Sequence, residues 1–385
     1  MDWSTCSPDI ILMLFKYLDS KSLVNCFSVC KSWRDLVDYH AGVKGIWPDL
    51  AQLAIYNKGI AFKQRSLLPW RDLYFNKQLW INGNVHIQFD TILELNQFKH
   101  MHVFEDNITV IIESGMKQYK VDTLVKTLEE NGVQDYQKTH CVTGKLVNGI
   151  LTLNIGHRQK HFSINCCAFI INNDHCFIID SGKIFRVVKC CCSVIPVDQP
   201  MKFKKTATLR LYNTLGTIHS ANVVNDVIYV VNREGRIVKL KGMDFLGVTL
   251  GNISFPPIYN PLVVCMFLRF SVIYSVRSED GSKSMKATKI TDTEEIVVEC
   301  SGLSCATPHS DLLFLGYEDG EVRGYLPKRM LQTNEPLFTF NIKDIVKCNL
   351  VDAAVKAIEV YEANESHYLF IATKNELIKV VVTHN

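Results

Sequence analysis

Glycine and proline are scarce in this sequence, which contains only 20 Gly and 11 Pro among 385 residues. That scarcity excludes a collagen-like repeat and argues against a linker-rich or disordered chain. Hydrophobic residues make up 47% of the chain and charged residues 21%, which is typical of a folded protein. Because domains usually span about 50–250 residues, we expect more than one folding unit.

An excess of one charge is also missing, since 42 Lys and Arg stand against 39 Asp and Glu and give a net charge of +3. A protein that coats duplex nucleic acid would carry a strong basic excess, so we expect no nucleic-acid partner. The longest stretch without charge, residues 245–268, is interrupted by Pro256, Pro257 and Pro261, which disfavour a membrane-spanning helix. The start, Met1 to Ser4, carries an acid where a signal peptide carries positive charge. We expect no membrane association.

Cysteine patterns of disulfide scaffolds and zinc sites are absent, although the chain has 14 cysteines. Several lie side by side in apolar runs, such as Cys166-Cys167 and Cys190 to Cys192, where neighbours on a strand point to opposite faces. We therefore expect free thiols, no metal, and a reducing compartment, the cytoplasm or the nucleus. The alternative is a metal site without the CxxC spacing usual for zinc, drawn from His161, Cys166, His175, Cys176 and Cys191.

Signature motifs of catalysis are missing as well: the sequence contains no GxGxxG, GxxxxGK[ST], GxSxG or HExxH. The acidic pairs Glu129-Glu130 and Glu294-Glu295 lie in polar surroundings and are predicted to be solvated. No cysteine is marked as a nucleophile. We expect no catalytic residue, no cofactor and no enzymatic activity in this chain.

Residues 7–47 differ from the rest and predict three short helices. Ser7 suits an N-cap, Pro8 the first helical position, and Asp9 the positive end of the helix dipole. Apolar residues then recur at helical spacing. The three stripes are Ile11, Leu14, Phe15 and Leu18; Leu23, Cys26, Phe27 and Cys30; and Val29, Trp33, Leu36 and Val37.

Three helices in so short a segment bury little surface alone, which indicates that they need a partner. One alternative is that they pack on the following domain of the same chain. Another is a DNA-reading helix-turn-helix, but residues 1–45 carry zero net charge, with five Lys or Arg against five Asp, and that serves phosphate binding poorly.

The same segment resembles an F-box over residues 3–47. The resemblance rests on Ser7 to Ile11, Leu14 to Asp19, Ser22-Leu23, and Val29 to Arg34. It departs from the family at the helix entry, where the proline stands one place later, at Pro8. The resemblance implies docking to the Skp adaptor of Skp–cullin–F-box ubiquitin ligases, with Trp33 as an anchor. The residues implied at the adaptor interface or in its immediate support are Pro8, Ile11, Leu14, Leu18, Leu23, Val29, Cys30 and Trp33.

Residues 48–80 are predicted to form a helical and aromatic bridge. The stretch from Asp49 to Tyr56 has helical spacing, and residues 68–75 are dense in aromatic side chains, which favours rigid coupling over a floppy tether.

Residues 81–385 predict an all-β unit, because short apolar runs alternate with tight polar turns. Four stretches repeat a strand–turn–strand unit, and their turns contain residues that tolerate positive φ. They are residues 175–188, 226–240, 311–325 and 368–381. A unit recurring every 40–60 residues is typical of four-stranded blades around an axis.

A length of about 44 residues per blade gives seven blades, with six or eight left open. The similarity to WD repeats is degenerate, since no Trp-Asp dipeptide ends a strand. Residues 122–132 break the pattern and predict a helical insertion, with Leu124, Val125 and Leu128 at helical spacing and Gly132 as its C-cap.

The fold class predicted is thus α + β and multidomain, a three-helix F-box followed by an all-β propeller. The resemblance implies that the propeller binds a protein target, in some members a phosphorylated one read by arginines. Candidate target contacts are Arg186, Arg233, Arg236, Arg277 and Arg323.

The function predicted is a non-catalytic receptor that links a protein substrate through the Skp adaptor to cullin. Two alternatives stay open. One is a scaffold that uses the same box without building a ligase, and the other is a propeller enzyme or small-ligand binder whose helices dock internally.

Overall fold

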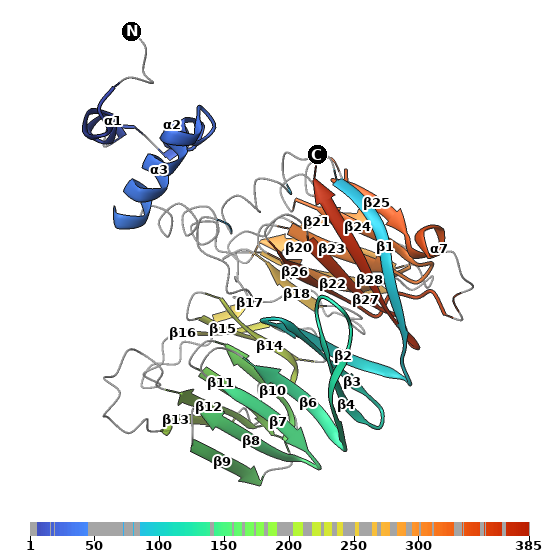
Figure 1. Ribbon diagram of the computed structural model, residues 1–385. Helices are drawn as coiled ribbons and strands as arrows, with labels where there is room; N and C mark the ends of the chain where they lie inside the picture. Colours follow the sequence, from blue (N-terminus) through green and yellow to red (C-terminus); the bar gives the residue numbers. More distant parts are fainter. Residues whose placement is uncertain are drawn as a thin grey trace.

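The structure is a computed structural model, and it describes the chain in segments (Figure 1). Of the residues between 179 and 301 that it describes, it gives the backbone alone. The described residues are 6–15, 17–18, 20–44, 72, 80, 85–138, 142–155, 158–163, 166–172, 175–180, 184–190, 203–210, 218–224, 227–232, 237–241, 251–253, 264–267, 271–277, 283–289, 295–299, 302–309, 312–326, 333, 335–346, 350, 352–363 and 367–384.

Three helices form the N-terminal unit, as the apolar spacing predicts: α1 (Pro8–Phe15), α2 (Ser20–Phe27) and α3 (Lys31–Lys44). Helix α1 begins at Pro8, and the carbonyl of Ser7 accepts hydrogen bonds from the backbone N–H groups of Ile10 and Ile11. The buried core of the unit, Ile11, Phe15, Leu23 and Val37, is surrounded by partly buried apolar residues of the same three helices. The helical unit therefore has a small core of its own.

No helix within the described residues is long and apolar enough to cross a membrane.

The described strands pair into seven four-stranded antiparallel sheets. Three sheets follow one another from β2 to β13: β2–β5 (Phe98–Phe104, Asn107–Ile112, Gly115–Lys120, Lys126–Asn131), β6–β9 (Val133–Lys138, Thr143–Val147, Ile150–Ile155, Arg158–Ser163) and β10–β13 (Cys166–Asn172, His175–Asp180, Ile184–Cys190, Phe203–Arg210).

The remaining sheets cover the second half of the chain, where the short helix α7 (Ile342–Ile345) follows β25. They are β14–β17 (Ile218–Val224, Val227–Asn232, Ile237–Lys241, Gly251–Ile253), β18–β21 (Val264–Phe267, Ser271–Arg277, Lys283–Lys289, Glu295–Glu299), β22–β25 (Leu303–His309, Leu312–Tyr317, Glu321–Tyr325, Phe338–Asn341) and the closing sheet β1-β28-β27-β26 (Val85–Glu94, Glu376–His384, His367–Ala372, Ala357–Glu362).

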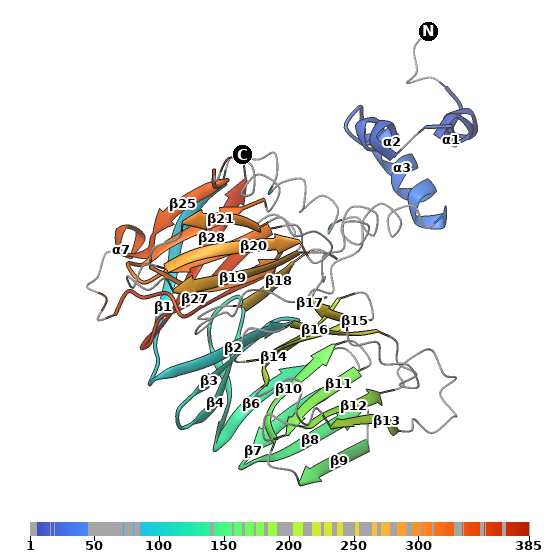
Figure 2. The same cartoon turned by 180° about the vertical axis from the view of Figure 1, so that it is seen from behind.

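The first strand closes the ring of sheets. Strand β1 pairs with β28 from Val85–His384 to Glu94–Glu376, so the beginning and the end of the β region share one sheet. Figures 1 and 2 show the cyan β1 among the orange and red strands of the C-terminal end. This pairing joins the two ends of the β region without a covalent link.

Apolar cores lie between neighbouring sheets. One core joins the closing sheet to β22–β25, and another joins it to β2–β5. Two further cores connect β2–β5 with β6–β9, and β6–β9 with β10–β13. Strand β23 is buried at every position, which is the pattern of a strand covered on both faces by neighbouring sheets.

All four predicted hairpins are confirmed by their pairing: β11 with β12, β15 with β16, β23 with β24, and β27 with β28. In the β23–β24 turn Gly320 has φ +93°, and an added Cβ would lie 3.0 Å from Ile342. A glycine is therefore required at this turn.

The predicted helical insertion at residues 122–132 is wrong, because Lys126–Asn131 forms β5. This strand is the outermost of its sheet and is solvent-exposed on both faces, so it lacks the alternation that marks a strand in sequence. Lys117 lies opposite Glu129 in the register, at 3.7 Å between Nζ and Oε1. Gly132, with φ +76°, ends this strand instead of a helix.

The predicted fold class is confirmed: helices at the N-terminus are followed by a β region of four-stranded sheets. The number of blades stays a prediction. Most of the predicted bridge lies outside the described residues, which include only Asp72 and Trp80 from residues 48–80.

Candidate functional site: the exposed apolar face of the N-terminal helices

Exposed apolar side chains gather in the helical unit. Of the ten large apolar side chains that are exposed among the described residues, seven lie between Ile10 and Tyr39, and the other three are Val125, Leu128 and Ile150. A concentration of this kind marks an interaction surface, because folded proteins rarely leave apolar patches open without a use.

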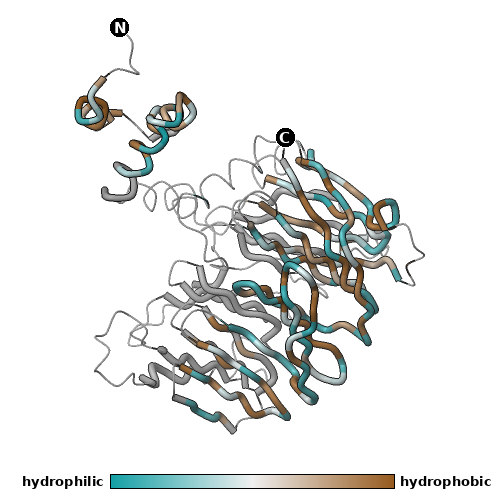
Figure 3. Tube along the Cα trace, viewed as in Figure 1, coloured by the Kyte–Doolittle hydropathy of each residue, from teal (hydrophilic) through white to brown (hydrophobic). Residues whose placement is uncertain are grey.

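Five of these seven follow one side of α1 and the turn after it. We call Ile10, Met13, Leu14, Tyr17 and Leu18 the α1 apolar face. Tyr17 is 83% exposed and Met13 57% exposed. Helix α1 contains no basic residue, and its one acid, Asp9, lies in the first turn (Figure 3 shows the helix as mostly hydrophobic). The face is apolar and nearly uncharged, as the centre of a protein interface is.

The helix can present this face because it has two apolar stripes. Ile11 and Phe15 point into the core of the unit and are buried at 3% and 2% exposure. Ile10, Met13, Leu14 and Tyr17 recur at i, i+3, i+4 and i+7 and occupy the adjoining side. One stripe therefore stabilises the unit while the other is left to solvent.

The eight residues implied at the adaptor interface divide into two groups. Five of them are exposed: Pro8, Leu14, Leu18, Val29 and Cys30. Ile11 and Leu23 are buried in the helical core, so they support the surface without forming it. Trp33 is half-buried at the edge of that core.

Trp33 is held in place from two sides. Its ring meets Phe15 edge to face, with centroids 5.7 Å apart and an angle of 73°. Its backbone N–H donates to Sγ of Cys30 at 3.5 Å, so the thiol caps the first turn of α3. Arg34 adds a link to α2, because its Nε donates to the carbonyl of Phe27 at 3.4 Å. Trp33 is thus a positioned aromatic, as an interface anchor requires.

Ile10, Met13 and Tyr17 are not among the residues that the F-box resemblance implies at the interface. Their spacing with Leu14 was the available signal, but the same helix contains a second apolar stripe, and spacing alone does not tell which stripe is buried.

The candidate arginines of the propeller that the structure describes lie on three different sheets. Arg186 lies in β12, Arg277 in β19 and Arg323 in β24. Arg233 and Arg236 lie outside the described residues.

Arg323 is engaged within its own sheet. Its Nη2 lies 2.6 Å from Oε2 of Glu321, and its guanidinium carbon lies 4.5 Å from the centre of the Tyr317 ring. The hydrogen bond to Glu321 raises the pKa of Arg323 above its usual value. A target phosphate would have to displace this partner.

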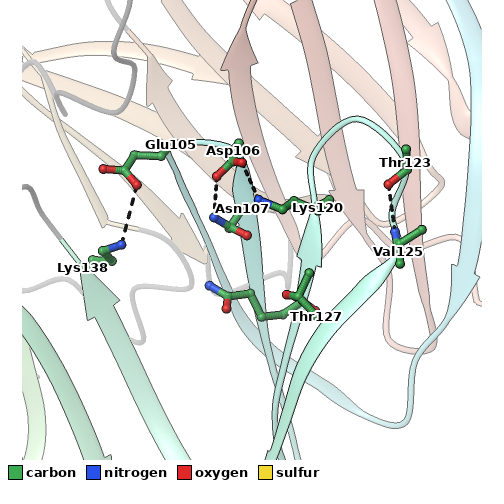
Figure 4. Close-up of polar contacts among 9 residues, drawn as sticks. Glu105, Asp106, Asn107, Lys120, Thr123, Val125, Thr127 and Lys138 are labelled. Atoms are coloured by element: carbon green, nitrogen blue, oxygen red, sulfur yellow. Dashed lines mark hydrogen bonds and ion pairs between the residues drawn. The ribbon is translucent and has the colours of Figure 1, made fainter.

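Lysines at one edge of β2–β6 are also paired with acids. Figure 4 shows Lys120 directed at Asp106 and Lys138 directed at Glu105, where Nζ and Oε2 are 3.7 Å apart. The hydrogen bond from Lys120 lowers the pKa of Asp106. Asn107 also donates to Asp106, at 2.6 Å. The lysines labelled in this view each lie beside an acid, so the edge is no open basic surface.

The alternative metal set is not assembled in the part of the chain that the structure describes, which contains no group of three His, Cys, Asp or Glu able to hold an ion. His161 lies on β9 with Nδ1 3.0 Å from Oγ1 of Thr152, Cys176 is buried on β11, and Cys191 lies outside the description. The five described side chains of cysteine, Cys6, Cys26, Cys30, Cys176 and Cys305, are free thiols.

A family model named F-box-like matches residues 8–41, which span α1, α2 and most of α3. Among solved structures, the WD40 domain of coronin from Toxoplasma gondii matches with a TM-score of 0.53 at 8% identity, over 79% of this chain and 87% of that one. The chain contains an F-box-like domain followed by a propeller fold.

Two more solved structures match the chain less well. The computationally designed Ika8 protein has a TM-score of 0.46 at 9% identity, covering 79% of this chain and 98% of that one. Hsv2 from Kluyvelomyces marxianus has a TM-score of 0.44 at 10% identity, covering 72% and 89%. No curated protein matches the chain.

These comparisons confirm the predicted F-box segment and the predicted propeller fold. The F-box-like domain suggests an adaptor role, and the coronin match shows the fold of the β region.

Proposed function

We propose that this protein is the substrate-receptor subunit of a Skp–cullin–F-box ubiquitin ligase. The observation that carries the proposal is the exposed α1 apolar face, which lies inside the segment that matches the F-box-like family. F-box domains generally bind the Skp adaptor, and an uncharged apolar face is what such an obligate helical contact requires.

The contact with the adaptor is assigned to two sets of residues. The α1 apolar face supplies the centre, together with the exposed Pro8, Val29 and Cys30, while Trp33 anchors its edge. Ile11 and Leu23 hold the helices in the arrangement that keeps this surface open.

The propeller supplies the second contact, with a protein target. Its sheets are rigid supports for the loops between strands, and such loops on a rigid scaffold are common binding elements. Through the adaptor and cullin, a bound target comes close to a conjugating enzyme that carries ubiquitin. Proximity raises the effective concentration of target lysines, so this chain itself makes and breaks no covalent bond.

We place this activity in the cytoplasm or the nucleus. The free state of the described thiols supports a reducing compartment, because cysteines of secreted domains are usually paired.

Reconstitution tests the proposal. Purified full-length protein is mixed with the Skp adaptor and then with cullin, and complexes are separated by size-exclusion chromatography. We expect a stable binary complex and a ternary complex with cullin. A binary complex that never takes up cullin would show a scaffold instead of a ligase subunit, and no complex at all would refute the adaptor role.

A further inference from the structure

Trp80 lies ahead of the first strand of the propeller and is buried, with 1% of its surface exposed. Its ring stacks on His367, with centroids 4.9 Å apart and an angle of 15° between planes. It also stacks on Phe338 at 5.8 Å and meets Phe314 edge to face at 5.5 Å. This large aromatic side chain is therefore fixed on several sides by other rings.

The partners of Trp80 come from two neighbouring sheets. His367 belongs to β27 of the closing sheet, whereas Phe314 and Phe338 belong to β23 and β25 of the preceding sheet. Both sheets contribute to one apolar core that includes Trp80. A residue from outside the sheets thus fills the junction at which the ring closes.

In the chain, Trp80 lies between the F-box-like domain and the first strand of the propeller. Strand β1 begins at Val85, and its first pair in the ladder is Val85 with His384. The F-box-like domain precedes Trp80 in the chain, so any pull from that domain reaches β1 through Trp80. When force is applied to the end of a paired strand, its hydrogen-bonded residue pairs separate one after another from that end. Because Trp80 is buried just before the first pair, its packing resists this force before the force reaches β1.

We propose that Trp80 is a positioning residue that fixes the point at which the chain from the F-box-like domain joins the propeller, and that protects β1 from being peeled off β28. The inference rests on the proposed function for its purpose, since transfer of ubiquitin depends on where the target is held. The anchoring itself depends on the packing alone.

Hydrogen exchange of the full-length chain, read by mass spectrometry, tests the anchoring. Trp80→Ala is expected to speed exchange in Val85–Glu94 by at least about tenfold, because β1 loses its anchor and opens locally. Trp80→Phe keeps an aromatic ring and should remain close to wild type. If the alanine variant does not fold, Trp80→Leu loses the same ring stacking while keeping an apolar side chain, and the same result is expected.

The matched control is Phe370→Ala. Phe370 is fully buried in β27, the strand that contains His367, but it belongs to the core shared with β2–β5. It should lower the thermal midpoint without selectively speeding exchange in β1. Equal acceleration in both variants, or none in the Trp80 variants, would overturn the inference.

Small-angle scattering of the full-length chain adds a readout that simple destabilisation does not move. While the protein is still folded, Trp80→Ala should broaden the distribution of interatomic distances, and Phe370→Ala should not. An unchanged distribution for the Trp80 variant would overturn the positioning role. Both measurements use the chain without the Skp adaptor. A failure to bind the adaptor would therefore refute the proposed function and leave this inference unaffected.

Discussion

The Nζ atom of Lys379 lies 2.8 Å from Oδ2 of Asp90, although only 4% of the Lys379 side chain is exposed. The same ammonium donates to the carbonyl of Asp122 at 2.5 Å and lies 4.3 Å from the centre of the Tyr368 ring. Lys379 belongs to β28 and Asp90 to β1, so one charge pair joins the two strands that close the ring. Its contact with Asp122 extends this link to the turn after β4.

Removing Asp90 and removing Lys379 should lower the free energy of unfolding by different amounts. Asp90→Ala leaves a buried ammonium without its carboxylate and should lower the free energy of unfolding by about 2–4 kcal/mol. Lys379→Met removes the buried charge itself and leaves Asp90 partly solvated, so the loss should be about 1 kcal/mol. Urea denaturation measures the free energy of unfolding of both variants and of the wild type.

The more exposed pair of Lys145 and Glu130, 2.7 Å apart with 31% and 38% of their side chains exposed, is the control for this comparison. Lys145→Met should change the free energy of unfolding by less than about 1 kcal/mol, because ion pairs that water reaches contribute little. A larger loss for Lys379→Met than for Asp90→Ala would contradict the account of the closing pair.

The helical unit allows its two apolar stripes to be separated by mutation. Leu23 is buried at 2% exposure, so Leu23→Ala should destabilise the three helices by about 2–4 kcal/mol. Met13→Ala, on the exposed stripe, should leave their stability within about 0.5 kcal/mol of wild type. Hydrogen exchange in residues 8–44 reports both effects. Similar protection losses in the two variants would show that the stripes are assigned wrongly.

Thiol alkylation should separate the cysteines by environment. Burial raises the pKa of Cys305 from its usual 9.0 to about 12, and burial also raises the pKa of Cys26. At pH 8 iodoacetamide should modify the exposed Cys30 rapidly and leave Cys305 unmodified in the folded protein. Peptide mass spectrometry gives the order of reaction, and early modification of Cys305 would be inconsistent with its burial in the closed ring.

The raised pKa of Cys305 also predicts a loss of stability in alkali. Above pH 9.0 the unfolded chain releases this thiol proton, whereas the folded chain keeps it up to about pH 12. The unfolded state therefore binds fewer protons, and the free energy of unfolding falls as the pH rises through this window. Cys305→Ala should make the fall between pH 9 and 10.5 shallower, as measured by urea midpoints. An unchanged slope would argue against a shifted thiol.

Local patterns predicted much of this fold. Pro8 at the start of α1 and the turns around residues 318–320 each carry their signal within a few residues, because caps and tight turns are decided locally. Strand β5 was missed because an outermost strand has solvent on both sides and shows no alternation. Its status depends on pairing with β4, which no local pattern reports.

The sequence indicated which segment carries the candidate site, but not which of its side chains are exposed. Leu14, Leu18 and Val29 are exposed as a docking surface requires, whereas Ile11 and Leu23 lie in the core. Which stripe of α1 is covered is decided by α2 and α3, so Ile10, Met13 and Tyr17 became visible only in the folded arrangement. The junction at Trp80 depends on contacts with residues more than 200 positions away.

The most direct test of the adaptor role is calorimetric titration of the Skp adaptor into full-length protein. Wild type should bind with one-to-one stoichiometry, and Leu14→Asp should weaken binding at least about 100-fold by placing a charge in the centre of the apolar face. Tyr39→Asp, at a residue of α3 that is 64% exposed, is the control and should bind like wild type. Unaltered binding by Leu14→Asp, or no heat of binding with wild type, would contradict the account.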